Sequence, residues 1–202
     1  CVDIMAHVMD SFFTRTPDCV LTDNMSIALL KTVVEFAPIA LKEPNNYHAR
    51  AELMLAGSFS HNDLTSIGRA GMPKGGEHGL EQQMSGMYDT AHGAGLAVIM
   101  PAWMEFMIDT QEDIHQFVKF ATNVFDVEYD MQDPKGVALE GVKRFRAWLK
   151  EIGMPLTFKE LGVKKEDMQK LLDHTCKKDG SVGHHIPLYY DDVKRIFDSV
   201  VE

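Results

Sequence analysis

Apolar residues recur every three or four positions through nearly the whole chain, which is the period of an amphipathic helix. No segment alternates apolar and polar residues over the length of a convincing strand. The spacing predicts helices around residues 2–13, 22–42 and 49–67, a glycine-rich loop over 68–76, short helices beginning near 78 and 92, and further helices around 114–125, 134–152, 168–172 and 193–200. The sequence therefore predicts an all-α fold of roughly eight or more helices.

Local signals mark where several of these helices begin and end. Asp133–Pro134 combines an N-capping side chain with a proline at the first helical position, and Gly153 suits the end of the same helix. Thr110 and Asp113 resemble a capping box before the next apolar run. Pro38 lies inside the second predicted helix, where its missing N–H predicts a kink or a break.

The composition suits one compact, folded domain. Of the 202 residues, 45% are hydrophobic and 25% are charged, so the chain can build a core and does not have the composition of a disordered protein. Its 30 acidic and 20 basic side chains give a formal net charge of −10. Nucleic-acid-binding proteins normally present a basic face, so this balance argues against that class.

The cysteines and the start of the chain bear on compartment and domain organisation. An odd number of widely spaced cysteines is typical of reduced thiols in a cytoplasmic protein. The longest apolar stretch, Gly93–Ile108, is interrupted by a proline and a glutamate and is too short to span a bilayer, so no membrane association is expected. The chain has no initiator Met and begins inside a helical pattern without a capping signal. We therefore expect a piece of a longer protein, whose missing portion lies before Cys1.

Four residues could hold a divalent metal. Asp3 and His7 are four positions apart, which places a carboxylate and an imidazole one turn apart on one helix face. His78 and His92 each lie at the start of a predicted helix and could converge on the same ion. One carboxylate oxygen and three imidazole nitrogens suit Fe(II) or Zn(II) with an open position for a substrate oxygen. The alternatives are a helix-surface ion pair for the first two residues and unshared helix-terminal histidines for the others.

Several segments of the chain resemble one known family. The longest is HGLEQQMSGMYDTAHGAGLAVIMPAWMEF over 78–106, and the others are VDIMAHVMDSFFT (2–14), APIALKEPNNYHAR (37–50), SHNDLTSIGRAG (60–71) and PLYYDDVKRIF (187–197). Together they resemble the C-terminal domain of iron-containing alcohol dehydrogenases, in the butanol dehydrogenase-like branch. The resemblance implies an all-α domain of the dehydroquinate synthase-like type over residues 1–202, with the N-terminal dinucleotide-binding domain outside this chain.

The resemblance also implies a site and an activity. In the family an Asp and a His one helical turn apart, with two later histidines, hold the metal; these correspond here to Asp3, His7, His78 and His92. The implied enzyme is an NAD(P)-dependent alcohol dehydrogenase or aldehyde reductase for small alcohols or aldehydes, with Fe²⁺ preferred and Zn²⁺ as the alternative. The metal polarises the substrate oxygen while hydride passes between the substrate carbon and NAD or NADP. This chain alone is expected to be inactive, because half of the cofactor site is absent.

One position departs from the family pattern, and two other functions stay open. Many relatives carry a histidine four residues after the third metal ligand; here that residue is Gln82, which does not titrate near neutral pH, so no general base is assigned. A glycerol dehydrogenase-like zinc enzyme domain is one alternative, which the segment over 92–106 argues against. A non-catalytic helical interaction domain with a degenerate site is the other, which the four intact ligands argue against. A homodimeric assembly also stays open.

Three further candidates are weaker. Asp89 lies one turn before His92 and could orient that ligand, or cap the helix instead. His61 falls in a segment that faces the active site in the family, although a role in helix packing suits it equally. His184–His185 could suggest metal binding, but adjacent side chains point apart and a surface loop is the simpler interpretation.

Overall fold

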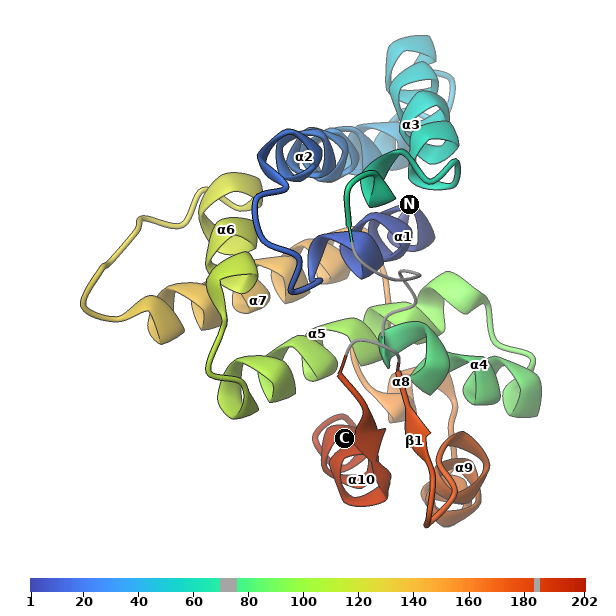
Figure 1. Cartoon of the computed structure of the whole chain (residues 1–202). Helices are drawn as coiled ribbons and strands as arrows, with labels where there is room; N and C mark the ends of the chain where they lie inside the picture. Colours follow the sequence, from blue (N-terminus) through green and yellow to red (C-terminus); the bar gives the residue numbers. More distant parts are fainter. Residues whose placement is uncertain (70–75, 184–185) are drawn as a thin grey trace.

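The computed structural model describes residues 1–69, 76–183 and 186–202, and within them the all-α fold is confirmed. The helices labelled or traced in Figure 1 are α1 (Val2–Phe12), α2 (Val20–Lys42), α3 (Tyr47–Ser60), α4 (Gly76–Tyr88), α5 (His92–Thr110), α6 (His115–Val124), α7 (Pro134–Glu151), α8 (Phe158–Leu161), α9 (Met168–Thr175) and α10 (Tyr190–Asp198). Two short 3-10 helices, η1 (Leu64–Ser66) and η2 (Lys165–Asp167), precede α4 and α9. Most of the predicted glycine-rich loop, and all of His184–His185, lie outside the described residues.

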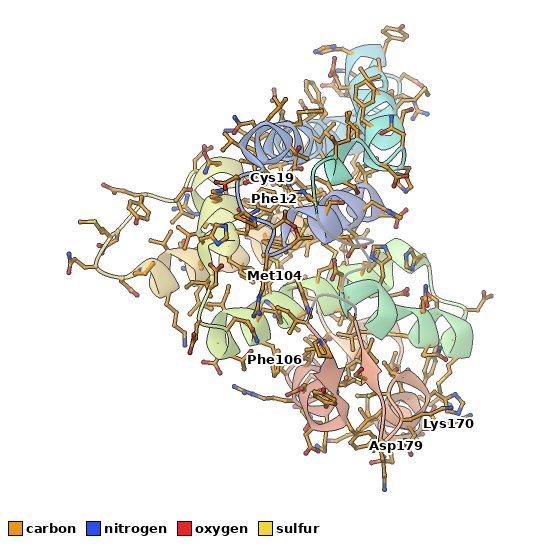
Figure 2. The ribbon with its side chains drawn as sticks, viewed as in Figure 1. Phe12, Cys19, Met104, Phe106, Lys170 and Asp179 are labelled. Carbon is orange, nitrogen blue, oxygen red and sulfur yellow. The ribbon has the colours of Figure 1, made fainter. Side chains whose placement is uncertain are left out.

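Helix α5 forms the centre of the core. Every residue from Gly95 to Ile108 except Glu105 is buried, and a helix that is apolar on all sides must be enclosed by other elements. Figure 1 shows α5 across the middle of the molecule, with α1 and α2 on one side and α9 and α10 on the other. Phe12 of α1 and Met104 of α5, both fully buried, are labelled in Figure 2. The longest apolar stretch of the sequence is thus a core helix.

Helix α2 continues through Pro38 without the predicted break. A proline has no N–H to donate to the carbonyl four residues earlier, which here belongs to Val34. The indole Nε1 of Trp148, on α7, donates a 3.0 Å hydrogen bond to that carbonyl. A partner from a distant part of the chain therefore satisfies the group that the proline leaves without a helical donor.

The predicted ends of α7 are confirmed. The Asp133 side chain accepts a 2.8 Å hydrogen bond from the N–H of Gly136 and so caps the first turn. At the other end Gly153 has a φ of +76°, and its N–H donates to the carbonyl of Lys150 at 3.0 Å. Glycine adopts a positive φ at little steric cost, which explains why a glycine ends this helix.

The predicted capping box after α5 is wrong. Helix α5 itself extends to Thr110, whose Oγ1 donates a 2.8 Å hydrogen bond to the carbonyl of Phe106. Asp113 instead accepts a 3.2 Å hydrogen bond from the N–H of His115, the first residue of α6. The two residues therefore belong to the end of one helix and the start of the next, and they do not cap a single helix together.

Two smaller features differ from the sequence-based expectation. The helix predicted over 49–67 is α3, which ends at Ser60; Asp63 then adopts a left-handed φ of +63° that leads into η1. A hairpin also forms, in which β1 (Ser181–Val182) pairs antiparallel with β2 (Leu188–Tyr189). Strands of two residues are too short to show an alternating pattern, so the hydrophobic period could not predict them.

A buried charged cluster ties α2 to α6 and to the segment after η1. Asp23 accepts hydrogen bonds from Arg69 at 2.7 Å, from Lys119 at 2.8 Å and from Gln116 at 3.1 Å. Burial alone would raise the pKa of Asp23, but these hydrogen bonds outweigh it, so the pKa is lowered. The donors therefore hold Asp23 ionised inside the fold.

Helix α2 is also the described helix that is long and apolar enough, by length and composition alone, to cross a membrane. Its most apolar window has a mean hydropathy of 1.4, and 22% of that window is buried. In this fold α2 packs against α1, α3 and α6. A groove of about 320 Å³ runs between α2 and α3, with Leu29, Leu55 and Phe59 among its apolar lining residues.

Candidate metal centre

The four side chains proposed from the sequence as metal ligands lie together where α1, α4 and α5 meet. Asp3 and His7 come from α1, His78 is the third residue of α4, and His92 is the first residue of α5. The Asp3 Oδ1 atom lies 3.6 Å from Nε2 of His7, 3.9 Å from Nε2 of His78 and 3.5 Å from Nε2 of His92. Ligand atoms about 2.0–2.2 Å from one tetrahedral ion are about 3.3–3.6 Å apart. The ligand atoms of Asp3, His78 and His92 all lie within 4.8 Å of one another and could share an ion, and His7 lies next to Asp3 on the same helix.

Two buried carboxylates lie on the Nδ1 side of the His78 and His92 rings. His92 forms a hydrogen bond through Nδ1 with Oε2 of Glu81. Nδ1 of His78 lies 2.9 Å from Oδ2 of Asp10, which is within ion-pair distance although not aligned as a hydrogen bond. An ionised carboxylate can only accept, so a neutral His92 ring carries its proton on Nδ1, and the short distance to Asp10 favours the same tautomer for His78. The Nε2 lone pairs of His78 and His92 consequently face Asp3.

The Asp3 carboxylate therefore faces hydrogen-bond acceptors, although a carboxylate needs hydrogen-bond donors. Its Oδ1 atom is buried and has no hydrogen-bond partner among the described residues. In a metal-free site with neutral rings, the Nε2 lone pairs of His78 and His92 repel the negative charge of this oxygen. A cation between these atoms would turn the repulsion into attraction. The arrangement thus has the chemistry of an ion site, and an internal salt bridge would need donors that it lacks.

The electrostatics of His7 favour its neutral form. Burial lowers the pKa of the His7 imidazole, and charge on the neighbouring His61 and His78 lowers it further, against the opposing effect of Asp3. A lowered pKa keeps the ring neutral near pH 7, and only a neutral imidazole offers a lone pair to a metal. His7 can therefore act as a ligand without first losing a proton to solvent.

The cluster is open on one side. The side chains of Asp3, His7 and His92 are 40%, 38% and 40% exposed, whereas that of His78 is 14% exposed. His78 therefore lies at the bottom of the cluster and the other three lie nearer to solvent. A small molecule could reach an ion held here from the exposed side.

His61 lies against Asp3 and His7. The sequence left open whether this residue lies near the site or serves helix packing, and the structure places it beside the site. Its Nε2 is 3.4 Å from Oδ2 of Asp3, and its ring centroid is 4.0 Å from that of His7. Its Nδ1 lies 3.0 Å from the carbonyl of Gly57 and 2.7 Å from Oγ of Ser60. A carbonyl only accepts, so Nδ1 carries the proton of the neutral ring and Nε2 faces Asp3 with its lone pair. Asp3, His7 and His61 also have ligand atoms close enough to hold one ion.

Two of the other sequence candidates take no part in the described cluster. Asp89 is exposed and has a left-handed φ of +51° just after α4, and no hydrogen bond joins it to His92 in the described part of the chain. The expectation that Asp89 orients His92 is therefore wrong, because Glu81 occupies the Nδ1 side of that ring. Gln82 is exposed on α4.

Sequence reasoning missed the carboxylates behind the rings, although a signal was present. Asp10 follows Asp3 by seven positions and His7 by three, so all three lie on one face of α1. Glu81 follows His78 by three positions on α4. Helical spacing applied to every acidic residue near a candidate ligand would have singled out both carboxylates, without showing which ring each one contacts.

A third buried carboxyl group, Glu77, lies beside Asp10 and His78. Ligand atoms of these three residues all lie within 4.8 Å of one another. Burial raises the pKa of Glu77 well above its usual range, and the negative charge of Asp10 raises it further. Both effects favour the protonated, uncharged form of Glu77 behind His78.

Comparisons with known proteins cover the whole chain. The family model described as Fe-containing alcohol dehydrogenase family, C-terminal, matches residues 1–201. NADH-dependent butanol dehydrogenase A of Clostridium acetobutylicum is 31% identical over 196 residues, which are 96% of this chain and 49% of that protein. The NADPH-dependent aldehyde reductase YqhD of Escherichia coli is 28% identical over 98% of this chain and 50% of its own length.

A solved structure gives the same correspondence in three dimensions. The crystal structure of NADH-dependent butanol dehydrogenase A from Thermotoga maritima superposes with a TM-score of 0.88 at 28% identity. The superposition covers 100% of this chain and 51% of that one. The chain thus spans about half the length of the relatives that it matches.

Proposed function

Because this chain belongs to the Fe-containing alcohol dehydrogenase family, we propose that it is the metal-binding catalytic domain of an NAD(P)-dependent alcohol dehydrogenase or aldehyde reductase. Asp3, His7, His78 and His92 are the proposed ligands of one divalent ion. Iron(II) is preferred because of the family, and the one-oxygen, three-nitrogen donor set also accepts zinc(II). The observation that carries the proposal is the convergence of three Nε2 atoms on a buried Asp3 oxygen without a hydrogen-bond partner in the described structure.

The donor set suits chemistry on an oxygen atom. Three neutral imidazoles and one carboxylate leave a site loaded with a divalent ion with one net positive charge. A divalent ion bound there supplies Lewis-acid polarisation of an alcohol or aldehyde oxygen. The partly exposed Asp3, His7 and His92 leave the approach for a small substrate. His61 stands beside Asp3 on this approach, where its ring can contact what enters.

The nicotinamide cofactor belongs to the proposal for a complete enzyme. The relatives named above are called NADH-dependent and NADPH-dependent, which supports a nicotinamide as the hydride carrier. Among the described residues, no strand is followed by a glycine-rich loop and a helix, the unit that cradles a dinucleotide phosphate. We therefore assign the metal and the substrate oxygen to this chain, and the nicotinamide to the remainder of such an enzyme.

Metal content tests this function directly. The purified chain is loaded anaerobically with Fe²⁺ or Zn²⁺, desalted, and analysed for metal per chain. We expect one ion in the unmodified chain and none in Asp3→Ala or His92→Ala. His115→Ala is the matched control, because His115 also contacts a carboxylate, that of Asp113, but far from the cluster in the sequence.

The outcomes separate the proposed enzyme domain from a degenerate one. One ion per chain that is lost in both cluster variants and kept in His115→Ala supports the proposed site. Equal metal content in all four proteins would show that binding does not involve the cluster. An unmodified chain that retains neither metal would favour the helical interaction domain with a degenerate site.

A further inference from the structure

We infer that Glu81 and Asp10 are positioning residues of the metal centre: each holds the Nδ1 side of one ligand imidazole, so that Nε2 faces the ion. The inference deepens the proposed function and rests on it for the identity of the ligands. Glu81 acts on His92, and Asp10 acts on His78. Carboxylates behind ligand histidines orient the ring and raise its basicity in many metal sites.

Glu81 is built into the core so that both of its oxygens are engaged. The side chain is fully buried. Oε2 accepts from Nδ1 of His92, and Oε1 accepts from Oγ of Ser85. A carboxylate removed from water in this way is costly unless each oxygen has a donor. The ring of His92 and the hydroxyl of Ser85 are those donors, so the position of Glu81 and the orientation of His92 depend on each other.

The neighbouring helix leaves the space that Glu81 needs. A Cβ atom at Gly95, three residues after His92 on α5, would overlap the carboxyl group of Glu81. The φ of Gly95 is not positive, so the glycine is required for space. Helix α5 thus supplies the ligand His92 and, one turn later, the gap for its partner.

Asp10 stands behind His78 at ion-pair distance, although the two groups are not aligned as a hydrogen bond. It is 8% exposed and shares a face of α1 with Asp3 and His7. Its Oδ2 lies 2.9 Å from Nδ1 of His78, the least exposed of the four ligands. Helix α1 therefore supplies two ligands and the partner of a third, and helix α4 supplies one ligand and the partner of a fourth.

The test measures ring tautomer and metal affinity, neither of which a merely structural carboxylate would move. Variants Glu81→Gln and Glu81→Ala are compared with the unmodified chain. The probe is Co²⁺ alone, titrated against a coloured chelator. Asp23→Asn is the matched control, because it alters a buried, hydrogen-bonded carboxylate outside the cluster. Circular dichroism checks that every variant is folded under the conditions used.

We expect a graded loss of Co²⁺ affinity. Gln keeps an oxygen acceptor without the charge and should weaken binding about 10-fold, whereas Ala removes both and should weaken it about 100-fold, the usual range for such partners. In the metal-free chain, long-range proton–nitrogen NMR should show the Nδ1–H tautomer of His92, and a mixture of tautomers in Glu81→Ala. Asp23→Asn should lose stability and keep its Co²⁺ affinity.

Two results would overturn different parts of the account. Unchanged Co²⁺ affinity and an unchanged His92 tautomer in both Glu81 variants would overturn the positioning role and leave the metal site standing. An unmodified chain that binds no Co²⁺ would count against the proposed function, and the His92 tautomer in metal-free protein would still decide whether Glu81 orients the ring. If Glu81→Ala does not fold, Glu81→Gln decides by the same two measurements.

Discussion

The chain contains two clusters built around a buried aspartate oxygen, and they differ in what that oxygen faces. Asp23 faces donors from Arg69, Lys119 and Gln116. The Oδ1 of Asp3 faces ring nitrogens, with no hydrogen-bond donor among the described residues. The Asp23 cluster is electrostatically complete as it stands. The Asp3 cluster lacks such donors, and the cation proposed above would complete it.

The difference teaches how to separate a structural charge from a functional one. Both aspartates lie near the start of a helix, and both are accompanied by polar residues that are distant in sequence. The Asp3 side chain is more exposed than that of Asp23, but exposure alone does not identify an ion site. The proton inventory does, because guanidinium and ammonium groups and the NH2 of an amide donate, whereas an imidazole protonated on Nδ1 offers only a lone pair at Nε2. A carboxylate surrounded by such lone pairs indicates an ion site.

The largest expected effect comes from breaking the complete cluster. Asp23→Ala leaves the fully buried Arg69 guanidinium without its carboxylate. Removing one partner of a buried ion pair costs about 3–5 kcal/mol of unfolding free energy. Urea unfolding of the metal-free chain measures this loss. Asp3→Asn, assayed in the same way, should change the unfolding free energy by no more than about 0.5 kcal/mol, because an amide can donate to an Nε2 lone pair. A similar large loss in both variants would contradict the contrast.

A second prediction is that added metal stabilises the Asp23 variant and leaves the Asp3 variant unchanged. Zn²⁺ at 100 times its dissociation constant should raise the unfolding free energy of the unmodified chain by about 2.7 kcal/mol, because the ion binds only the folded state. Asp23→Asn should gain the same increment from its lower starting value. Asp3→Asn should gain nothing at that Zn²⁺ concentration. An equal increment in Asp3→Asn would place the ion elsewhere.

A third prediction concerns a buried polar group without charge. Trp148→Phe removes the donor to the Val34 carbonyl, which Pro38 cannot supply from within α2. The loss should be about 1–2 kcal/mol, smaller than for the Asp23 pair because the group is neutral. Pro38→Ala restores a helical donor to Val34, so Trp148→Phe should cost less in that background. Equal costs in the two backgrounds would show that the hydrogen bond contributes nothing measurable.

The smallest expected effect is the acid dependence of the Asp23 cluster. The pKa of Asp23 is lowered in the folded state, so its stabilising contribution is complete above the unfolded-state pKa of about 3.9 and is lost as the pH falls toward the folded value. Urea unfolding between pH 5 and pH 3 should therefore show a steeper loss for the unmodified chain than for Asp23→Asn. Parallel curves would indicate that Asp23 is not held ionised by its partners.

The sequence predicted those parts of the fold that depend on nearby residues. The helical period gave the all-α class, and Asp133 and Gly153 marked the ends of α7 because caps act within a few residues. The same rule failed at Thr110 and Asp113, where a local pattern did not reveal that α5 runs on to Thr110. The break considered at Pro38 is absent for a complementary reason, because the donor that satisfies the Val34 carbonyl comes from the distant Trp148.

The candidate site shows the same difference between features that nearby residues predict and features that depend on distant packing. Spacing on one helix brought Asp3 and His7 together as a hypothesis. Their places at predicted helix starts suggested His78 and His92, and the family resemblance supported all four. Asp89 was chosen to support His92 because it is close in sequence, whereas Glu81, eleven residues away, lies against the ring. Which carboxylate stands behind a ligand depends on how α4 packs against α5, and no local pattern records that packing.

Anomalous diffraction tests the central claim most directly. Crystals of the chain grown with Fe²⁺ or Zn²⁺ are measured on both sides of the absorption edge of that metal. We expect one strong peak, about 2.0–2.2 Å from an oxygen of Asp3 and from Nε2 of His7, His78 and His92. A metal-loaded crystal with no peak among these four side chains, or with its peak at other residues, would contradict the account.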